Sequence, residues 1–283
     1  MDIDAARRVA DTVLHGETVL SPYRASAFRG LSRWQFGVLM PADVAAADPS
    51  QPATAQTECV LEAGARFRLR LLLRFLQVQR RTAYRWLPDR GRFRPVGALD
   101  VDGTPVTSSD EAVGHEVSLD VDDGSLRHAV RVPGGFAREE LRDSRGELVG
   151  QLVRHRRPLC ATLDVSVSVL PGPRPALRLR VWVENRSRAG TGSREVALTT
   201  ALVATHVILG IEGGAFVSMV DPPEWAVDAV ECCANVGLYP VLAGPPGRRD
   251  TLLATPIVLD DHPGCGGTGE ADEVLLLRTL AAG

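Results

Sequence analysis

The fold class follows from one stretch, TLDVSVSVLPGPRPALRLRVWVE (residues 162–184), in which two alternating runs flank a short turn. In the first run Leu163 and Val165 alternate with Asp164 and Ser166, and the second run keeps the same period of two. A period of two places one set of side chains on one face of a strand. Proline and glycine in PGPRP mark the turn. The stretch therefore predicts an antiparallel hairpin with one buried face.

A second alternating run, RFRLRLLLRFLQVQRR (66–81), indicates a long strand with leucine and phenylalanine on one face and arginine on the other. The phase changes near Phe75, because Leu76 and Val78 are apolar whereas Gln77 is polar. A β-bulge near Phe75 would explain this change. An amphipathic helix is the alternative, since leucine and arginine both favour helices.

Other segments extend the β-rich pattern. Apolar residues at helical spacing predict a short helix over 4–15, with Asp2 or Asp4 as its cap. The run 196–211 is nearly all apolar, which indicates a buried strand or helix. Further strands are expected at 33–40 (RWQFGVLM), 238–244 (LYPVLAG) and 251–261 (TLLATPIVLDD), and a short helix or strand at 271–282.

The polar loop 184–193 is the best internal boundary. It predicts a β-rich part over 1–190 and a smaller α+β part over 191–283, packed together as one unit. The fold class expected is α+β and β-rich, with mostly antiparallel, sandwich-like sheets and a few short helices. The regular βαβ rhythm of a parallel sheet is missing.

Composition narrows the setting and the partners. The chain has 283 residues, 45% of them hydrophobic, and a net charge of −3, so no global field favours nucleic acid or an anionic membrane. No apolar run approaches the roughly 20 residues of a membrane span. Five scattered cysteines do not resemble a secreted disulfide framework, which favours the cytoplasm. The oligomeric state stays open.

The segment Arg66–Arg94 is a candidate anion-binding surface, because it holds ten arginines and one acid with aromatic residues interleaved. Arg66, Arg68, Arg70 and Arg74 are the candidate contacts. Residues 99–123 offer the competing interpretation, since they hold eight acids and no arginine. A basic strand beside an acidic strand is ordinary cross-strand pairing, and we favour it.

Catalytic and metal sites have weaker support. His206, Glu212, Asp221 and His262 form a candidate polar cluster that could serve a metal-dependent hydrolase. Cys232, Cys233, His262 and Cys265 could ligate zinc, but adjacent cysteines diverge by about 100° on a helix and lack the usual spacing. Ser218 lacks the flanking glycines of a nucleophile elbow. We therefore expect no cofactor.

The stretch GIEGGAFVSMVDPPEW (210–225) has a structural explanation instead. Gly213 and Gly214 can supply positive φ for a tight turn. Asp221 can cap a following helix, with prolines in its first turn and Glu224 three residues on.

Seven segments carry a resemblance to a known family: SPYRASAFRG, RWQFGVLMP, QTECV, EGGAFVSMVDPP, NVGLYPVLAG, DTLLATPIVLDDHP and DEVLLLRTL. The chain resembles, over most of its length, a family of uncharacterised bacterial proteins associated with gene neighbourhoods of nickel–iron hydrogenases, especially in actinobacteria. The chain departs from that family at 261–270, where DHPGCGGTGE replaces a longer acidic stretch. The family has no assigned active site, so the resemblance transfers no residue role.

The resemblance implies an accessory or assembly role. With no persuasive catalytic constellation, we expect a non-catalytic interaction protein with a protein partner, serving a hydrogenase or another redox complex. The alternatives are a hydrolase around Glu212, Asp221 and His262, and an anion or nucleic-acid binder through Arg66–Arg94.

Overall fold

The computed structural model describes residues 1–15, 36–121, 125–172 and 174–263. Its strands are β1 (Thr54–Leu87), β2 (Arg92–Val96), β3 (Ala98–Val101), β4 (Thr104–Thr107), β5 (Ser109–Val121), β6 (Ser125–Val132), β7 (Gly135–Arg142), β8 (Leu148–Arg156), β9 (Leu159–Leu170), β10 (Ala176–Asn185), β11 (Val203–Phe216), β12 (Tyr239–Leu242) and β13 (Thr251–Thr255). Its helices are α1 (Ile3–His15), α3 (Ala42–Ala47), α4 (Arg194–Leu198) and α5 (Val227–Glu231), with 3₁₀ turns η1 (Pro88–Arg90) and η2 (Glu224–Ala226).

Within the described ranges, eleven strands form one antiparallel sheet whose main order is β12-β13-β11-β1-β10-β9-β6, and β3 pairs with β4 alone. The predicted β-rich, antiparallel class with a few short helices is confirmed. The two stacked sheets of a sandwich are not confirmed, because the strands curl as one sheet. After residue 190, β11 pairs with β1, β13 pairs with β11 and β12 pairs with β13, so the sheet is continuous across the expected boundary.

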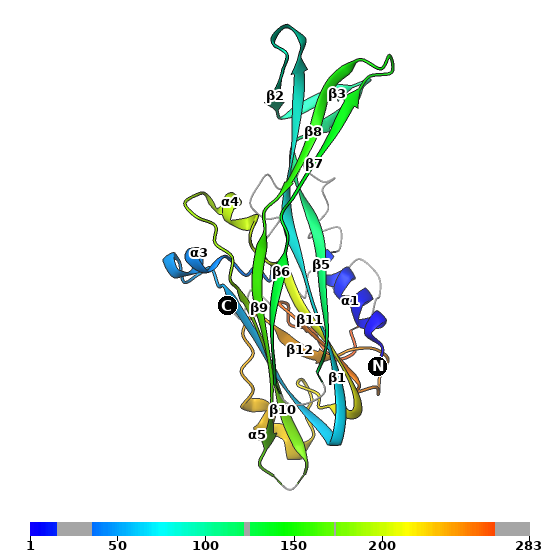
Figure 1. Ribbon diagram of the computed structural model, residues 1–283. Coiled ribbons are helices and arrows are strands. Elements are labelled where there is room, and N and C mark those ends of the chain that lie inside the picture. Colours follow the sequence, from blue (N-terminus) through cyan, green and yellow to red (C-terminus); the bar gives the residue numbers. More distant parts are fainter. Residues whose placement is uncertain (16–35, 122–124, 173, 264–283) are drawn as a thin grey trace.

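The longest strand, β1, changes direction at residues 64–67 (Figure 1). Before the bend it pairs with β10, and after the bend it pairs with β5, while β11 follows its other side. The β11 register shifts between Ala63 and Arg68 of β1. Gly213 (φ +77°) and Gly214 lie in β11 opposite this bend, where an added Cβ would meet the carbonyl oxygens of Arg66 and Glu62, each at 2.7 Å. The two glycines therefore permit close strand approach, and the predicted tight turn is wrong.

Both faces of β1 are buried beyond the bend. Leu69, Leu71, Leu73 and Phe75 face the main core, together with inward residues of β9, β10 and β11. Leu72, Leu76 and Val78 face a second core beneath α1, which contributes Ala6, Val9, Ala10 and Leu14. Arg70 and Arg74 flank Leu72 on the second face, whereas Leu76 and Val78 follow each other there, so the change of hydrophobic phase near Phe75 marks the point where arginines no longer interrupt this face.

The predicted bulge near Phe75 exists, but its extra residue lies on the neighbouring strand. The β1–β11 register shifts between Arg74 and Leu76, whereas β1 keeps step with β5 through the same positions. Ala204 on β11 adopts a positive φ of 49° at this point. A long strand over 66–81 is therefore correct, and the helical alternative is wrong.

The hairpin predicted from residues 162–184 is confirmed as β9 and β10, which pair from Leu170–Ala176 to Ala161–Asn185. Leu163, Val165 and Val181 are buried on one face, as alternation requires. Val169 near the turn is 80% exposed, so the buried face ends before the tip.

The N-terminal helix is also confirmed. Asp2 caps it, because its carboxylate accepts a hydrogen bond of 3.0 Å from the Ala5 amide. The apolar run 196–211 was predicted to be a buried strand or helix. It contains the end of helix α4 and then most of strand β11. The strands β12 and β13 appear where LYPVLAG and TLLATPIVLDD predict them.

One predicted strand is wrong in its described part, and other predictions fall on residues that the structure does not describe. The strand expected at 33–40 is wrong for residues 36–40, which form a turn at Gly37 (φ +54°) and one bridge from Leu39 to Leu202. Residues 33–35, the element at 271–282 and Cys265 lie outside the described ranges. No helix of the described residues is long and apolar enough to cross a bilayer.

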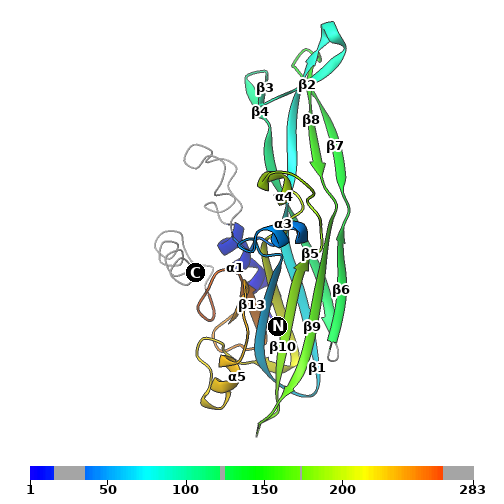
Figure 2. The ribbon, with the colours of Figure 1, turned by 90° about the vertical axis from the view of Figure 1, so that its left-hand side faces the viewer.

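An arm projects beyond the body of the molecule (Figures 1 and 2). It consists of the end of β1 with β2, β3, β4, β7 and β8. Ala83, Leu99 and Leu152 form its small buried core. The arm thus has apolar packing of its own, separate from the two cores of the body.

Substitution of one glycine, Gly150, tests how tightly the core of the arm is packed. A Cβ at Gly150 in β8 would meet the Tyr84 carbonyl oxygen and come within 2.5 Å of Leu99 Cδ2. We expect Gly150→Ala to lower the free energy of unfolding by about 1–3 kcal/mol and to speed hydrogen exchange in β8, because overpacking displaces its neighbours. Gly97→Ala, with nothing within 4 Å, is the control. Equal behaviour of both variants would contradict this packing.

Candidate functional site

The four residues of the predicted polar cluster occupy different surroundings. His206 is fully buried, while Glu212 and Asp221 are exposed and His262 is half-buried. Glu212 lies 4.0 Å from Arg68, and His262 Nδ1 lies 3.2 Å from the Gly244 carbonyl oxygen. In the described part of the chain, no group of three or more His, Cys, Asp or Glu side chains could hold a metal ion.

His206 belongs to the packing of the body. Its Nδ1 lies 2.8 Å from the Ala204 carbonyl oxygen, and its Nε2 lies 3.4 Å from Arg74 Nη1. A carbonyl can only accept and a guanidinium can only donate, so this geometry assigns the proton to Nδ1 of a neutral ring. Arg74 also contacts Asp11 on α1 and Glu116 on β5. The histidine and the arginine therefore tie α1 to the sheet.

The predicted helix cap at Asp221 is wrong. Pro223 precedes η2, and no side chain caps that turn. Ser218 Oγ accepts hydrogen bonds from the amides of Val220 and Asp221 and donates to Asp261, which in turn accepts from the Leu242 amide. A serine that folds back on following amides is a local turn device. Sequence reasoning weighed Ser218 only as a nucleophile and missed this role.

Three arginines in the first half of the segment, Arg70, Arg74 and Arg80, are neutralised by β5, whereas Arg66 and Arg68 precede the part of β1 that pairs with β5. The register places Arg70 opposite Asp120, Arg74 opposite Glu116 and Arg80 opposite Asp110. The nitrogen–oxygen distances are 2.9, 3.3 and 3.7 Å. The hydrogen bond from Arg70 lowers the pKa of Asp120. Cross-strand pairing, the favoured interpretation, is confirmed for these three arginines but not for Arg66 and Arg68.

Glu111 is the centre of a half-buried group of contacts at the base of the arm. Its carboxylate lies 3.1 Å from Arg81, 3.2 Å from Arg154 and 3.1 Å from Gln79. Burial by itself raises its pKa, but the hydrogen bonds from Gln79 and Arg81 and the charge of Arg154 outweigh burial and lower the pKa. The ionised carboxylate therefore joins β1, β5 and β8 at the base of the arm.

The second half of the segment, at the tip of the arm, is different. Arg85, Arg90, Arg92 and Arg94 are exposed, and none has an ion-pair partner among the described residues. Arg85 lies directly opposite Arg94 on β2. The neighbouring pair, Trp86 and Phe93, occupies the other face of the ribbon with ring centroids 4.8 Å apart. We call Arg85, Arg90, Arg92 and Arg94 the arm-tip arginines.

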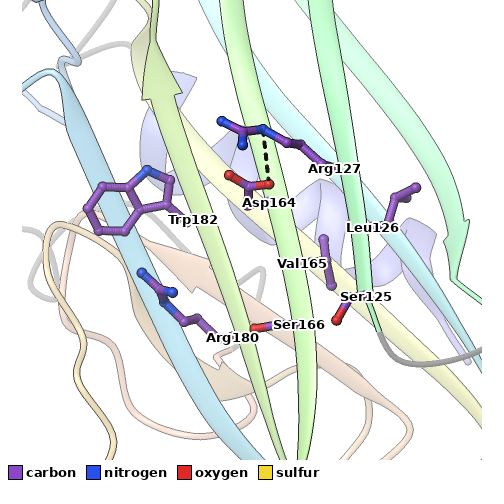
Figure 3. Close-up of a pocket in the computed structure, with 8 residues that line it drawn as sticks. All are labelled: Ser125, Leu126, Arg127, Asp164, Val165, Ser166, Arg180 and Trp182. Atoms are coloured by element: carbon purple, nitrogen blue, oxygen red, sulfur yellow. Dashed lines mark ion pairs between the residues drawn. The ribbon is translucent and has the colours of Figure 1, made fainter.

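A shallow hollow of about 390 Å³ lies on the outer face of β6, β9 and β10 (Figure 3). Arg127 and Asp164 form an ion pair of 3.5 Å across it. The Arg180 guanidinium carbon lies 5.1 Å from the centre of the Trp182 ring. This combination of aromatic ring, cations and hydroxyl groups suits binding of a polar or anionic surface.

The sequence of the hairpin 162–184 contains a feature that points to this hollow. In ALRLRVWVE the outward positions are Arg178, Arg180, Trp182 and Glu184, so a tryptophan stands in the polar register. Tryptophan is enriched at binding interfaces, where one end of its ring is apolar and the other is polar. Sequence reasoning assigned the face correctly but did not draw this conclusion.

A further hollow of about 430 Å³ is lined by Glu62, Gly64, Arg174, Gly213 and Gly214. It lies at the bend of β1, where the two glycines of β11 leave space beside the backbone. The glycine-rich stretch thus shapes a surface depression, but none of the four residues of the predicted polar cluster lines it.

Comparison of the chain with protein-family models and with curated proteins finds no match in either. The association with hydrogenase gene neighbourhoods therefore stays a prediction, and the function must be argued from the surface.

Glu111 generates a prediction about pH. A carboxyl whose pKa is lowered by folding contributes its full stabilisation above its ordinary pKa, about 4.3. That contribution declines below this value and is lost as the pH falls through the lower pKa of the folded state. We expect Glu111→Gln to lower the free energy of unfolding by about 1–2 kcal/mol near neutral pH, with the difference shrinking below about pH 4. Urea unfolding of the wild type and the variant, near neutral pH and below about pH 4, measures the difference in the free energy of unfolding. Glu147→Gln, at an exposed position, is the control. A loss independent of pH would contradict the assignment.

Proposed function

We propose that the protein is a non-catalytic accessory protein that binds a protein partner, in the assembly of a hydrogenase or another redox complex. One observation carries the proposal: Arg85 lies directly opposite Arg94, and neither has an ion-pair partner in the described part of the chain. Like charges directly opposite in a strand pair destabilise it. A hairpin that keeps such a pair is best explained by an anionic group supplied from outside.

Elsewhere in β1, arginines are neutralised by acids of the neighbouring strand. Where β1 passes through the body, Arg70, Arg74 and Arg80 all lie opposite acids of β5. Beyond Arg81, the opposing strand changes from acidic β5 to basic β2. The change coincides with the part of β1 that leaves the body and enters the arm (Figure 1).

The charge distribution favours an acidic protein surface over a nucleic acid. Asp100 and Asp102 are exposed on the neighbouring β3–β4 hairpin. The chain as a whole carries a net charge of −3. A long phosphate backbone that extended past the arm-tip arginines would meet these carboxylates, whereas a compact acidic patch would not.

The anion or nucleic-acid binder and the hydrolase are the two alternative functions, and they differ in their structural support. An anion or nucleic-acid binder uses the same arginines, and it predicts affinity that falls steeply with salt for any polyanion. A hydrolase around Glu212, Asp221 and His262 has no assembled ligand set among the described residues. A cytoplasmic setting belongs to the proposal, and free thiols at Cys59, Cys160, Cys232 and Cys233 agree with it.

Affinity purification from the native host, with mass spectrometry of the bound proteins, tests the proposal. We expect the double variant Arg85→Gln/Arg94→Gln to recover its main partner about tenfold less than the wild type, because two charge-assisted contacts are lost. Exposed Arg8→Gln on α1 is the control. Equal recovery by both variants, or recovery of nucleic acid alone, would refute a protein partner at the arm tip.

The unbound protein offers an independent check. Arg94→Glu replaces a repulsive pair with an attractive one, so we expect it to raise the free energy of unfolding by about 0.2–1 kcal/mol while reducing partner recovery. Chemical denaturation measures the first effect. A destabilised variant would mean that Arg94 supports the free fold instead of a bound partner.

A further inference from the structure

The edge of the sheet at β6 is open. β6 pairs with β9 on one side, and no strand of the described residues pairs with its other side. Figure 2 shows β6 at the outer margin of the body. An unpaired edge presents a row of backbone donors and acceptors, which can accept an additional strand.

The inner face beside this edge is incompletely covered. β5 contacts β6, yet β5 pairs only with β1 among the described strands. Val117 and Leu119 of β5 and Leu126 of β6 pack against the main core but remain only half-buried. An added strand with apolar residues facing inward would cover these side chains.

The outer face of the edge is basic. Arg127 and Arg131 are exposed and share this face, since they are four residues apart in one strand. Arg127 pairs with Asp164, whereas Arg131 has no ion-pair partner among the described residues. The hollow with Arg180 and Trp182 lies beside them on the same face (Figure 3). Acidic side chains on an added strand would face these cations.

We infer that the β6 edge binds an extended segment of the protein partner in which apolar residues facing inward alternate with acidic residues facing outward. The inference rests on the proposed function, because it gives the partner a second contact in addition to the arm tip. Main-chain hydrogen bonds supply binding, and the alternation of apolar and acidic residues supplies specificity.

A second copy of the chain fits this edge poorly. In the two antiparallel self-pairings that align equal faces over most of β6, Arg131 lies directly opposite or diagonal to Arg127 of the second copy. Both arrangements bring like charges together. The adjoining edge strand β7 is exposed and carries charges of both signs, Arg138, Glu139, Glu140 and Arg142, which is a usual protection against strand addition. β6 lacks acidic residues altogether, so it differs from β7 in the charge that it presents.

The first experiment uses a fluorophore-labelled peptide of four Glu-Val repeats, with Lys-Val and Glu-Ser peptides as controls. We expect saturable binding of the Glu-Val peptide alone, with slower hydrogen exchange at alternate amides of β6. Arg127→Gln/Arg131→Gln should weaken binding about fivefold, and Arg8→Gln should not change it. Absence of binding at millimolar peptide, equal binding of the Lys-Val peptide, or protection of β6 by self-association without peptide would overturn the inference.

A backbone test complements the first. Amides of successive residues in an edge strand point to opposite sides, so of His128→Pro and Ala129→Pro one removes a bond to β9 and the other removes an outward donor. We expect the variant that keeps the thermal stability of the wild type to lose peptide binding; full binding by that variant would overturn strand addition.

Partner recovery separates the two proposals. If peptide binding fails but recovery still depends on Arg85 and Arg94, only the edge inference is wrong. If the peptide binds at β6 but recovery does not depend on those arginines, the arm-tip function is wrong.

Discussion

The structure depends on β1, which buries apolar side chains on both faces after its bend. One face needs the curled sheet of β9, β10 and β11 to cover it, and the other needs α1. Because both faces carry buried side chains, a buried polar group on this strand must find a partner inside the fold. Gln77 is fully buried, and its amide nitrogen lies 2.7 Å from the Arg157 carbonyl oxygen. The bend at residues 64–67 allows both halves of the strand to contribute to the main core.

The arginines of β1 serve two purposes, and the opposing strand decides which. Opposite β5, each cation meets a carboxylate at short distance, so the charges hold strands together and leave little field outside. Opposite β2, Arg85 meets Arg94, and the charge remains available to solvent. The arm places this charge away from the body, where an anionic surface can reach it. In the described part of the chain, the acids and histidines do not assemble into a group that could hold a metal ion.

Much of the fold could be predicted, since alternation depends only on burial of one face. The β9–β10 hairpin, α1 and the strands β12 and β13 follow from local pattern and turn residues. The errors have physical reasons. Gly213 and Gly214 resemble a turn locally, but β11 uses them to approach β1. Asp221 resembles a cap, but Ser218 binds the amides in that turn. The sequence predicted the arm-tip arginines only as part of the long segment Arg66–Arg94. Its pattern did not show which of these arginines pair with acids and which do not.

The sequence by itself determined that the chain is β-rich and antiparallel, which residues face the core, and that basic and acidic segments would pair. These properties depend on periods of two and on composition, which neighbours along the chain supply. Only the tertiary structure decided where the acidic strand ends, so that Arg85 and Arg94 oppose each other, and that β6 is an edge among the described strands. Strand order and register join residues far apart in the chain, and a period of two is compatible with many such pairings.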